Sequence, residues 1–208
     1  MISSLEFLRQ NKVMAQPRRL VLASTSRYRR ELLARLGLAF DIASPQVDER
    51  PLGKEAPADT ALRLAALKAQ SVRAQHRDAL IIGSDQVAMS AGRVLDKPGD
   101  HANAARQLRA LSGKRAEFHT ALALLDAANG RLQTQVVPCT VHFRELDDKT
   151  IENYLRREQP FDCAGSAKAE GLGIALIAAI ETRDPTALIG LPLIELTSML
   201  ERAGLRVV

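Results

Sequence analysis

The sequence predicts an α/β protein built on a mixed β-sheet, and three observations carry that prediction. The 208 residues are 46% hydrophobic, which is enough to bury one compact core or two small lobes around a cleft. From Arg19 onward, short apolar strand patterns alternate with helix patterns, as in parallel βα units. Two longer strand patterns joined by Asn129-Gly130 add an antiparallel hairpin. Parallel units and a hairpin in one chain indicate a mixed sheet.

Several of the expected helices have a start or stop signal. Ser26 caps the first helix and Gly37 closes it, Asp147 caps a later helix, and Pro192 starts the last one. The expected strands are 20–23, 40–43, 79–82, 116–125, 132–143 and 174–180. The expected helices are 26–36, 58–74, 101–111, 147–157 and 192–203. A turn is expected at Gly92, a glycine-rich loop at 165–173, an N-terminal extension at 1–17, and a single domain at 18–208.

Charge and composition exclude several classes of partner. The formal net charge is +5, but residues 1–35 alone carry +6, whereas a nucleic-acid-binding protein spreads its positive charge along a face or groove. Aromatic residues are only 3%, with no Trp, so few rings could stack on bases. No apolar run approaches the roughly 18 residues of a membrane span, and residues 1–17 lack a secretory pattern. We therefore expect no nucleic-acid polymer and no membrane partner.

The two cysteines, Cys139 and Cys163, form no CxxC pair. This spacing argues against a disulfide scaffold and against a cysteine-based zinc module. The composition predicts a reducing, cytosolic setting.

The segment from Leu22 to Arg30 is the strongest local feature. A buried strand leads through Ser24 and Ser26 into a helix start that contains Arg27, Arg29 and Arg30. Helix N-termini attract phosphate, and hydroxyls and guanidinium groups add hydrogen-bond donors. An ordinary serine cap with solvated arginines is the alternative. Three arginines at a helix N-terminus oppose the dipole preference, which favours an anion site.

A second feature is Gly83-Ser84-Asp85-Gln86, which is expected just past an apolar strand, at the carboxyl edge of the sheet. Open α/β sheets bind ligands at that edge, where an aspartate can hold a divalent metal or orient a water. A turn-forming aspartate is an equally good reading. The P-loop, GxSxG and HExxH motifs are absent.

Six motifs in order resemble the Maf family of nucleoside triphosphate pyrophosphatases, over Arg19 to Val208. They are Leu22–Leu33, Val47-Asp48-Glu49, Leu64-Ala65 with Lys68-Ala69, Gly83-Ser84-Asp85, Lys97-Pro98, and Ala164-Gly165-Ser166 with Gly171. Two positions in the first motif depart from the family pattern. Arg27 stands in place of the family proline, which leaves the shape of that loop open, and Tyr28 stands in place of the first family arginine.

The resemblance implies an elongated mixed sheet with flanking helices and two lobes around a central nucleotide-binding cleft. It also implies hydrolysis of a nucleoside triphosphate between the α and β phosphates, with Asp85 as proton acceptor. Glu49 and Asp85 would hold a divalent cation, Mg²⁺ or Mn²⁺. The residues expected to bind phosphate are Ser24, Ser26, Arg29, Lys68 and Lys97. The family further implies a homodimer.

Three positions that separate the substrate branches of the family are Tyr28, Gln86 and Glu170 here, a set similar to the 7-methyl-GTP branch. An aromatic face attracts a flat cation such as N7-methylated guanine. A carboxylate accepts from the N1–H and the amino group of guanine, and Gln86 is expected to read the O6 edge or to hold Glu170. A packing Tyr28 and a solvent-facing Glu170 are the alternatives. Other candidate functions are a pyrophosphatase for dTTP/UTP or non-canonical purine triphosphates, and a non-enzymatic nucleotide-binding regulator of septum formation.

Overall fold

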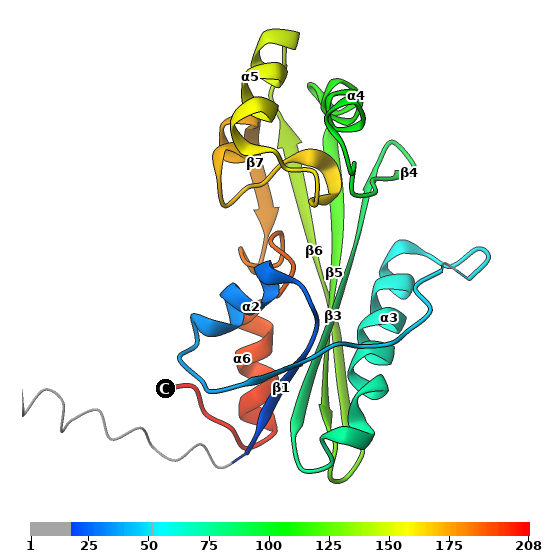
Figure 1. Cartoon of the computed structure of the whole chain (residues 1–208), viewed down its shortest axis with the longest axis vertical. Coiled ribbons are helices and arrows are strands. Elements are labelled where there is room, and N and C mark those ends of the chain that lie inside the picture. The colour runs from blue at the N-terminus through cyan, green and yellow to red at the C-terminus, as the bar shows by residue number, and fades with distance from the viewer. Residues whose placement is uncertain (1–17, 51) are drawn as a thin grey trace, which may run out of the picture.

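A computed structural model describes residues 18–50 and 52–208, so the expected extension 1–17 lies outside the described residues. One seven-stranded sheet runs the length of the molecule (Figure 1). Its strands are β1 (Leu20–Ala23), β2 (Asp41–Ala43), β3 (Leu80–Ser90), β4 (Arg93–Val94), β5 (Arg115–Asp126), β6 (Leu132–Phe143) and β7 (Ile177–Thr182). The helices are α2 (Arg27–Ala34), α3 (Pro57–Ser71), α4 (His101–Leu111), α5 (Asp148–Glu158) and α6 (Leu193–Arg202).

The sheet is mixed, as predicted. Its strand order is β2-β1-β3-β5-β6-β7, and β4 pairs with β3 outside this path. β1 is parallel to β2 and to β3, whereas β3, β5, β6 and β7 form antiparallel pairs. β3, β5 and β6 are 11 to 12 residues long and extend along the whole molecule (Figure 1). The α/β class and the elongated sheet are therefore confirmed.

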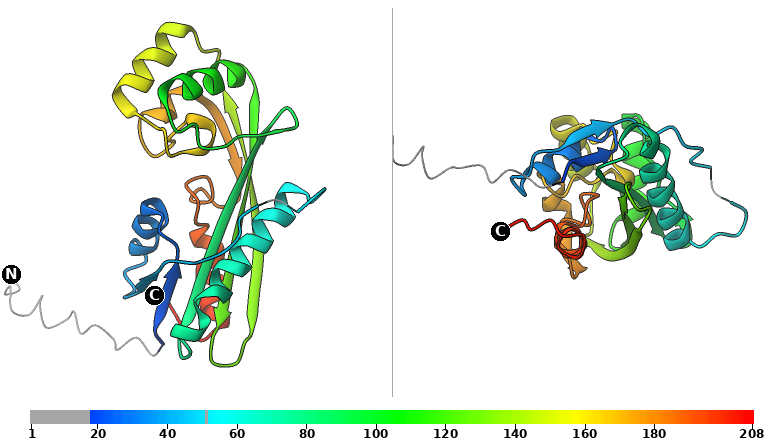
Figure 2. Two further views of the ribbon diagram at one scale, coloured as in Figure 1. Left: turned by 45° about the vertical axis from the view of Figure 1, so that its right-hand side comes forward. Right: turned by 90° about the horizontal axis from the view of Figure 1, so that it is seen from below.

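The part of the molecule around β1, α2, α3 and α6, at the bottom of Figure 1, is called here the lower lobe, and the part around α4, α5 and β7 the upper lobe. In the lower lobe, helices cover both faces of the sheet. α2 and α6 cover one face and α3 covers the other (Figures 1 and 2). α3 presents alanines, among them Ala65 and Ala69, to the sheet. A Cβ atom added to Gly83 would lie 2.1 Å from the backbone oxygen of Ala65. Small residues thus bring the α3 backbone against β3.

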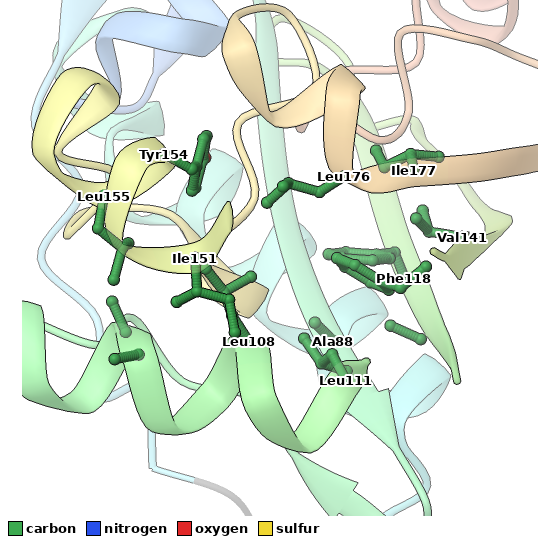
Figure 3. Packing of buried hydrophobic residues seen from close by; sticks show 14 of the residues in the cluster. Ala88, Leu108, Leu111, Phe118, Val141, Ile151, Tyr154, Leu155, Leu176 and Ile177 are labelled. Carbon is green, nitrogen blue, oxygen red and sulfur yellow. The ribbon is translucent and has the colours of Figure 1, made fainter. Parts of the chain in front are cut away.

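The upper lobe has a separate core, packed between the sheet and α4 and α5. Phe118, Ile151 and Leu176 meet in its centre (Figure 3). The hydroxyl of Tyr154 accepts a hydrogen bond from Lys168 N at 2.9 Å, which fixes the loop after α5. No helix in the described ranges is long and apolar enough to cross a membrane.

One expected strand boundary is wrong, and it concerns the site. The strand predicted to end at Ile82 continues to Ser90, so Asp85 lies inside β3 and not past its end. The apolar run stops at Ile82, but the polar residues after it stay in the ladder with β5. The last residue pair between β1 and β3 is Leu22 with Ile82, and β1 ends one residue later, at Ala23. Asp85 therefore lies beside the carboxyl end of β1, where β3 continues without it.

Other element boundaries shift by smaller amounts. The strand expected at 174–180 is β7 at Ile177–Thr182, because residues 172–176 fold into a 3₁₀ helix. Gly173 packs against the Lys168 backbone there, where a Cβ would lie only 2.5 Å from Lys168 N. Pro192 precedes α6 as its cap residue, and α2 and α3 end earlier than expected. The bounds of α4 and β6 agree with the prediction, as does the turn at Gly92, whose φ is +75°.

Candidate active site

Three charged side chains meet beside the carboxyl end of β1. Lys68, on the sheet-facing side of α3, donates to Asp85 Oδ1 at 2.6 Å, and its Nζ lies 2.8 Å from Glu49 Oε1. Lys68 is 6% exposed and Asp85 8%, whereas Glu49 reaches in from the exposed segment between β2 and α3. An ammonium group has three protons. Lys68 thus binds both carboxylates and keeps one donor for a ligand.

Arg29 brings a second positive charge to this cluster. Its Nε donates to Gly190 O at 2.9 Å, and it forms no salt bridge with a carboxylate within the described ranges. Burial lowers the pKa of Arg29, while the charges of Asp85 and Glu49 raise it. A partly buried guanidinium group without a carboxylate partner is a good site for a phosphate.

Ser24 and Ser26 lie between β1 and α2. Ser24 is buried and its hydroxyl accepts from Ser26 N at 3.2 Å. Ser26 caps α2, and its hydroxyl accepts from Arg29 N at 3.4 Å. The predicted cap is therefore confirmed. Both oxygens act as acceptors, so the hydroxyl protons can still be donated to an anion.

Tyr28 connects the two lobes. Its hydroxyl lies 3.0 Å from Asp162 Oδ1 and accepts from Arg27 Nη2 at 2.6 Å. The Arg27 guanidinium lies 4.7 Å from the ring centroid and 3.3 Å from Asp162. One face of the Tyr28 ring thus already carries a cation.

Glu170 is exposed, on the loop of the upper lobe that follows α5. It lies near Cys163, whose thiol pKa is raised to about 11, first by burial and in smaller part by the charges of Asp162 and Glu170. Cys163 Sγ is 3.4 Å from the Tyr28 hydroxyl. The loop that carries Glu170 and the start of α2 that carries Tyr28 therefore meet at the junction of the lobes.

Gln86 follows Asp85 on β3 and points to the opposite face of the sheet, because side chains alternate along a strand. Its Nε2 lies 2.8 Å from Thr120 Oγ1, 3.0 Å from Ala187 O and 3.2 Å from Leu188 O. It does not hold Glu170, so that expectation is wrong: Thr120 and the loop between β7 and α6 occupy the NH₂ group that would have to donate to the carboxylate.

Lys97 stands apart from the other predicted phosphate-binding residues. It is exposed, on the segment between β4 and α4, and within the described ranges it makes no hydrogen bond or ion pair with them. A cavity of about 580 Å³ beside the β3–β4 turn, lined in part by Met89 and His119, holds none of the predicted site residues.

The loop between β7 and α6 was not predicted as part of the site. Its carbonyl groups bind Arg29, Thr120 and Gln86. Backbone carbonyls leave no sequence signal, and only Gly190, with φ +115°, marks the unusual path of the chain there.

A family model described as Maf-like protein matches residues 19–203. The chain belongs to the Maf family. The chain is 59% identical over 188 residues, 90% of its length and 94% of the relative's, to the 7-methyl-GTP pyrophosphatase of Thiobacillus denitrificans. It is 55% identical over 186 residues, 89% of its length and 94% of the relative's, to the protein of that name from Cupriavidus pinatubonensis. The solved structure of the Staphylococcus aureus Ham1 protein is 13% identical with a TM-score of 0.44, covering 61% of this chain and 72% of that one.

The Maf chain offers two carboxylates for a divalent cation. Glu49 and Asp85 both contact the Lys68 ammonium, so the two carboxylates face the same region of the site. No group of three or more potential ligands from His, Cys, Asp and Glu occurs in the described part of the chain. Mg²⁺ is commonly held by one or two carboxylates together with waters and substrate phosphates. The residues fit a cation that binds with a polyphosphate.

Glu55 fastens the Maf segment that carries Glu49 to α3. Its carboxylate accepts from Arg63 Nε and Nη2, both at 2.8 Å, and from the Thr60 hydroxyl at 3.0 Å. The Arg63 hydrogen bonds, aided by Thr60 and Leu52 N, lower the pKa of Glu55 from 4.5 to about 2. The folded state thus binds this proton less readily than the unfolded state.

This depressed pKa predicts a specific acid sensitivity. The contribution of the Glu55 pair is fully present above about pH 4.5 and is lost as the pH falls towards 2. Glu55→Gln is expected to flatten the fall of the free energy of unfolding across that window, measured by urea unfolding at a series of pH values. Glu201→Gln, at an exposed position on α6, is the control and keeps the wild-type slope. A wild-type slope in Glu55→Gln would refute the prediction.

Proposed function

We propose that this Maf protein hydrolyses 7-methyl-GTP to 7-methyl-GMP and pyrophosphate. Two relatives of that name match about 90% of the chain at 55% and 59% identity. The observation that carries the chemistry is the cluster of Lys68 between Glu49 and Asp85, with Arg29 alongside. It combines a carboxylate base with a lysine that keeps one donor free and an arginine that no carboxylate contacts, which suits a polyphosphate.

In this proposal Asp85 accepts a proton from the water that attacks the α-phosphorus. The bond from the α-phosphorus to the bridging oxygen breaks, and pyrophosphate leaves with that oxygen. Arg29 and the third proton of Lys68 bind phosphate oxygens and offset the charge that develops on them. Ser24 and Ser26 donate hydrogen bonds from their hydroxyl groups. Lys97 stays a predicted phosphate ligand, because in the described structure it lies apart from the other four.

Glu49 and Asp85 would hold Mg²⁺ or Mn²⁺ against the phosphates. When bound, the ion supplies a positive charge that polarises a phosphoryl oxygen. The fit rests on the two carboxylates that meet at Lys68.

The methylated guanine of the substrate would lie towards Tyr28 and Glu170, at the junction of the lobes. The ring of Tyr28 stacks on the positively charged purine, and the Glu170 carboxylate accepts from its N1–H and amino group. Their nearness to Cys163 supports a shared base site.

Glu170→Ala is expected to lower kcat/KM for 7-methyl-GTP by roughly tenfold or more, because a charge-assisted hydrogen bond to a cationic base is lost. The effect on GTP, whose base is neutral, is smaller, so the preference for the methylated substrate falls. Pyrophosphate release from both substrates measures this. Glu201→Ala is the matched control, and an unchanged preference in Glu170→Ala would contradict the role of Glu170.

The test of the function is pyrophosphate release from a panel of triphosphates with and without Mg²⁺ or Mn²⁺. The panel contains 7-methyl-GTP, GTP, dTTP, UTP and ITP. Faster turnover of dTTP, UTP or ITP would assign the chain to another substrate, and nucleotide binding without hydrolysis would favour a regulatory role in septum formation. The homodimer and the cytosolic setting stay predictions, the first open to measurement of mass in solution.

A further inference from the structure

We infer that Thr120 and the loop at 187–190 fix the amide of Gln86 so that only its oxygen can meet the substrate. Gln86 then selects a purine edge that carries hydrogen-bond donors, and Thr120 is a positioning residue for base specificity. This inference rests on the proposed function, because it names how the same site chooses its base.

The contacts form a closed network behind Gln86. Thr120, on β5, lies opposite Gln86 in the antiparallel register and is fully buried. Its hydroxyl lies 2.9 Å from Ala187 O and 2.8 Å from Gln86 Nε2. Gln86 Nε2 also lies 3.0 Å from Ala187 O and 3.2 Å from Leu188 O.

The chemistry of these groups determines which way the amide points. Two carbonyl oxygens can only accept. The single proton of the Thr120 hydroxyl goes to Ala187 O, so the Thr120 oxygen must accept from Gln86. If the amide were turned over, its oxygen would face two carbonyl oxygens, and the Thr120 hydroxyl would have to give up Ala187 O to donate to it. The NH₂ group must therefore face the loop.

The oxygen of the same amide is left for a ligand. A planar amide places Oε1 and Nε2 on different sides of its carbon, so the locked NH₂ group turns Oε1 away from the loop carbonyls. No hydrogen bond to Oε1 occurs among residues 18–50 and 52–208. Ser84, the preceding side chain on the same face, lies 2.9 Å from Gly190 O, which also accepts from Arg29. On this face of β3, Gln86 is thus the next side chain after Ser84. Ser84 contacts Gly190 O, the carbonyl that also holds Arg29, a proposed phosphate-binding residue.

An acceptor at this position cannot read the O6 edge of guanine, because O6 is itself an acceptor. The sequence led us to expect that Gln86 reads the O6 edge by donating a hydrogen bond, and we replace that expectation with an acceptor role for Gln86. Oε1 pairs with a donor. Because Glu170 is proposed to accept from N1–H and one proton of the 2-amino group, the second proton of that amino group is the donor left for Oε1. Adenine carries no amino group at this position and is disfavoured.

The loop is itself held rigidly, which makes the lock effective. Asp184 is 1% exposed, and its carboxylate accepts from Thr186 N and the Thr186 hydroxyl and from Ile194 N and Glu195 N at the start of α6. The carbonyls of Ala187 and Leu188 are therefore fixed relative to β3 and β5, and the amide cannot turn by moving the loop.

The test compares Thr120→Val with Thr120→Ser in the full chain. Valine keeps the shape and removes the hydroxyl, whereas serine keeps the hydroxyl. kcat and KM are measured for 7-methyl-GTP, for 7-methyl-ITP, which lacks the amino group, and for 1,7-dimethyl-GTP, which lacks N1–H. Wild type is expected to disfavour 7-methyl-ITP by tenfold or more, mainly through KM, whereas the response to 1,7-dimethyl-GTP reports on Glu170. Thr120→Val reduces that ratio about tenfold, and Thr120→Ser restores it.

Gln86→Glu provides a second variant of the same shape, in which a carboxylate oxygen faces the two carbonyls, and it is expected to lose the ratio as well. Thermal unfolding of every variant shows that the fold is kept. An unchanged ratio in Thr120→Val would overturn the role of Thr120, and an unchanged ratio in Gln86→Glu would overturn the role of Gln86. A wild type that does not distinguish 7-methyl-ITP from 7-methyl-GTP would overturn the inference as a whole. Failure of the proposed function is a different result, namely no pyrophosphate from 7-methyl-GTP with wild-type protein.

Discussion

Asp85→Asn lowers kcat by about 10²–10⁴-fold, the range found when a general base is lost, with little change in thermal stability. The amide has nearly the same shape and still accepts from Lys68, so the contact between α3 and β3 stays. It cannot take a proton from water at neutral pH. The measurement is pyrophosphate release from 7-methyl-GTP with Mg²⁺, together with a thermal unfolding curve.

Asp78→Asn is the matched control, since Asp78 is an exposed aspartate before β3 whose nearest ion-pair contact is Arg19 at 3.8 Å. It keeps wild-type turnover. Full activity in Asp85→Asn would remove Asp85 as the proton acceptor. A large loss of stability would instead show that its charge is needed for folding.

Gly83→Ala is expected to destabilise the protein by about 2–4 kcal/mol, at or above the upper part of the range for overpacked cores. The added Cβ would lie 2.1 Å from Ala65 O and 2.9 Å from Ala69 N. Both are backbone atoms of α3, so no side chain can rotate out of the way. The helix has to move away from β3 and carry Lys68 away from Asp85.

Thermal and urea unfolding measure the stability loss, expected as a fall in Tm of about 5–15 °C for a chain of this size. Activity at low temperature, corrected for the folded fraction, falls as well because Lys68 is displaced. Gln70→Ala, on the exposed side of the same helix, is the control and leaves both unchanged. Wild-type stability in Gly83→Ala would mean that α3 does not pack this closely.

The sequence predicted the fold class because hydrophobic periodicity and capping residues are local signals. α4 and β6 have the expected bounds, and Ser26 caps α2 as expected. The end of β3 was missed because Ser84 and Gln86 interrupt the apolar run, and the pattern cannot show that a distant loop buries them. Their contacts with that loop span more than 100 residues.

In the site too, local sequence motifs predicted some residues, and contacts with distant parts of the chain were missed. The motifs of the family resemblance predicted Glu49, Lys68 and Asp85, and the structure brings these three together. They predicted neither the Gly190 carbonyl that holds Arg29 nor the Thr120 hydroxyl that holds Gln86. Such positioning depends on the path of the backbone, and residue type alone carries no record of it.

β3, β5 and β6 run uninterrupted through both lobes, and this continuity determines how the molecule responds to force and to denaturant. Two lobes joined by a flexible linker can rotate about it and melt separately. Here a movement of one lobe relative to the other has to bend or twist three hydrogen-bonded strands at once, and the loss of either core removes the support of strands that the other core needs. We therefore expect one cooperative unfolding transition and a stiff molecule, whose opening and closing are elastic deformations of the sheet and not rotations about a hinge.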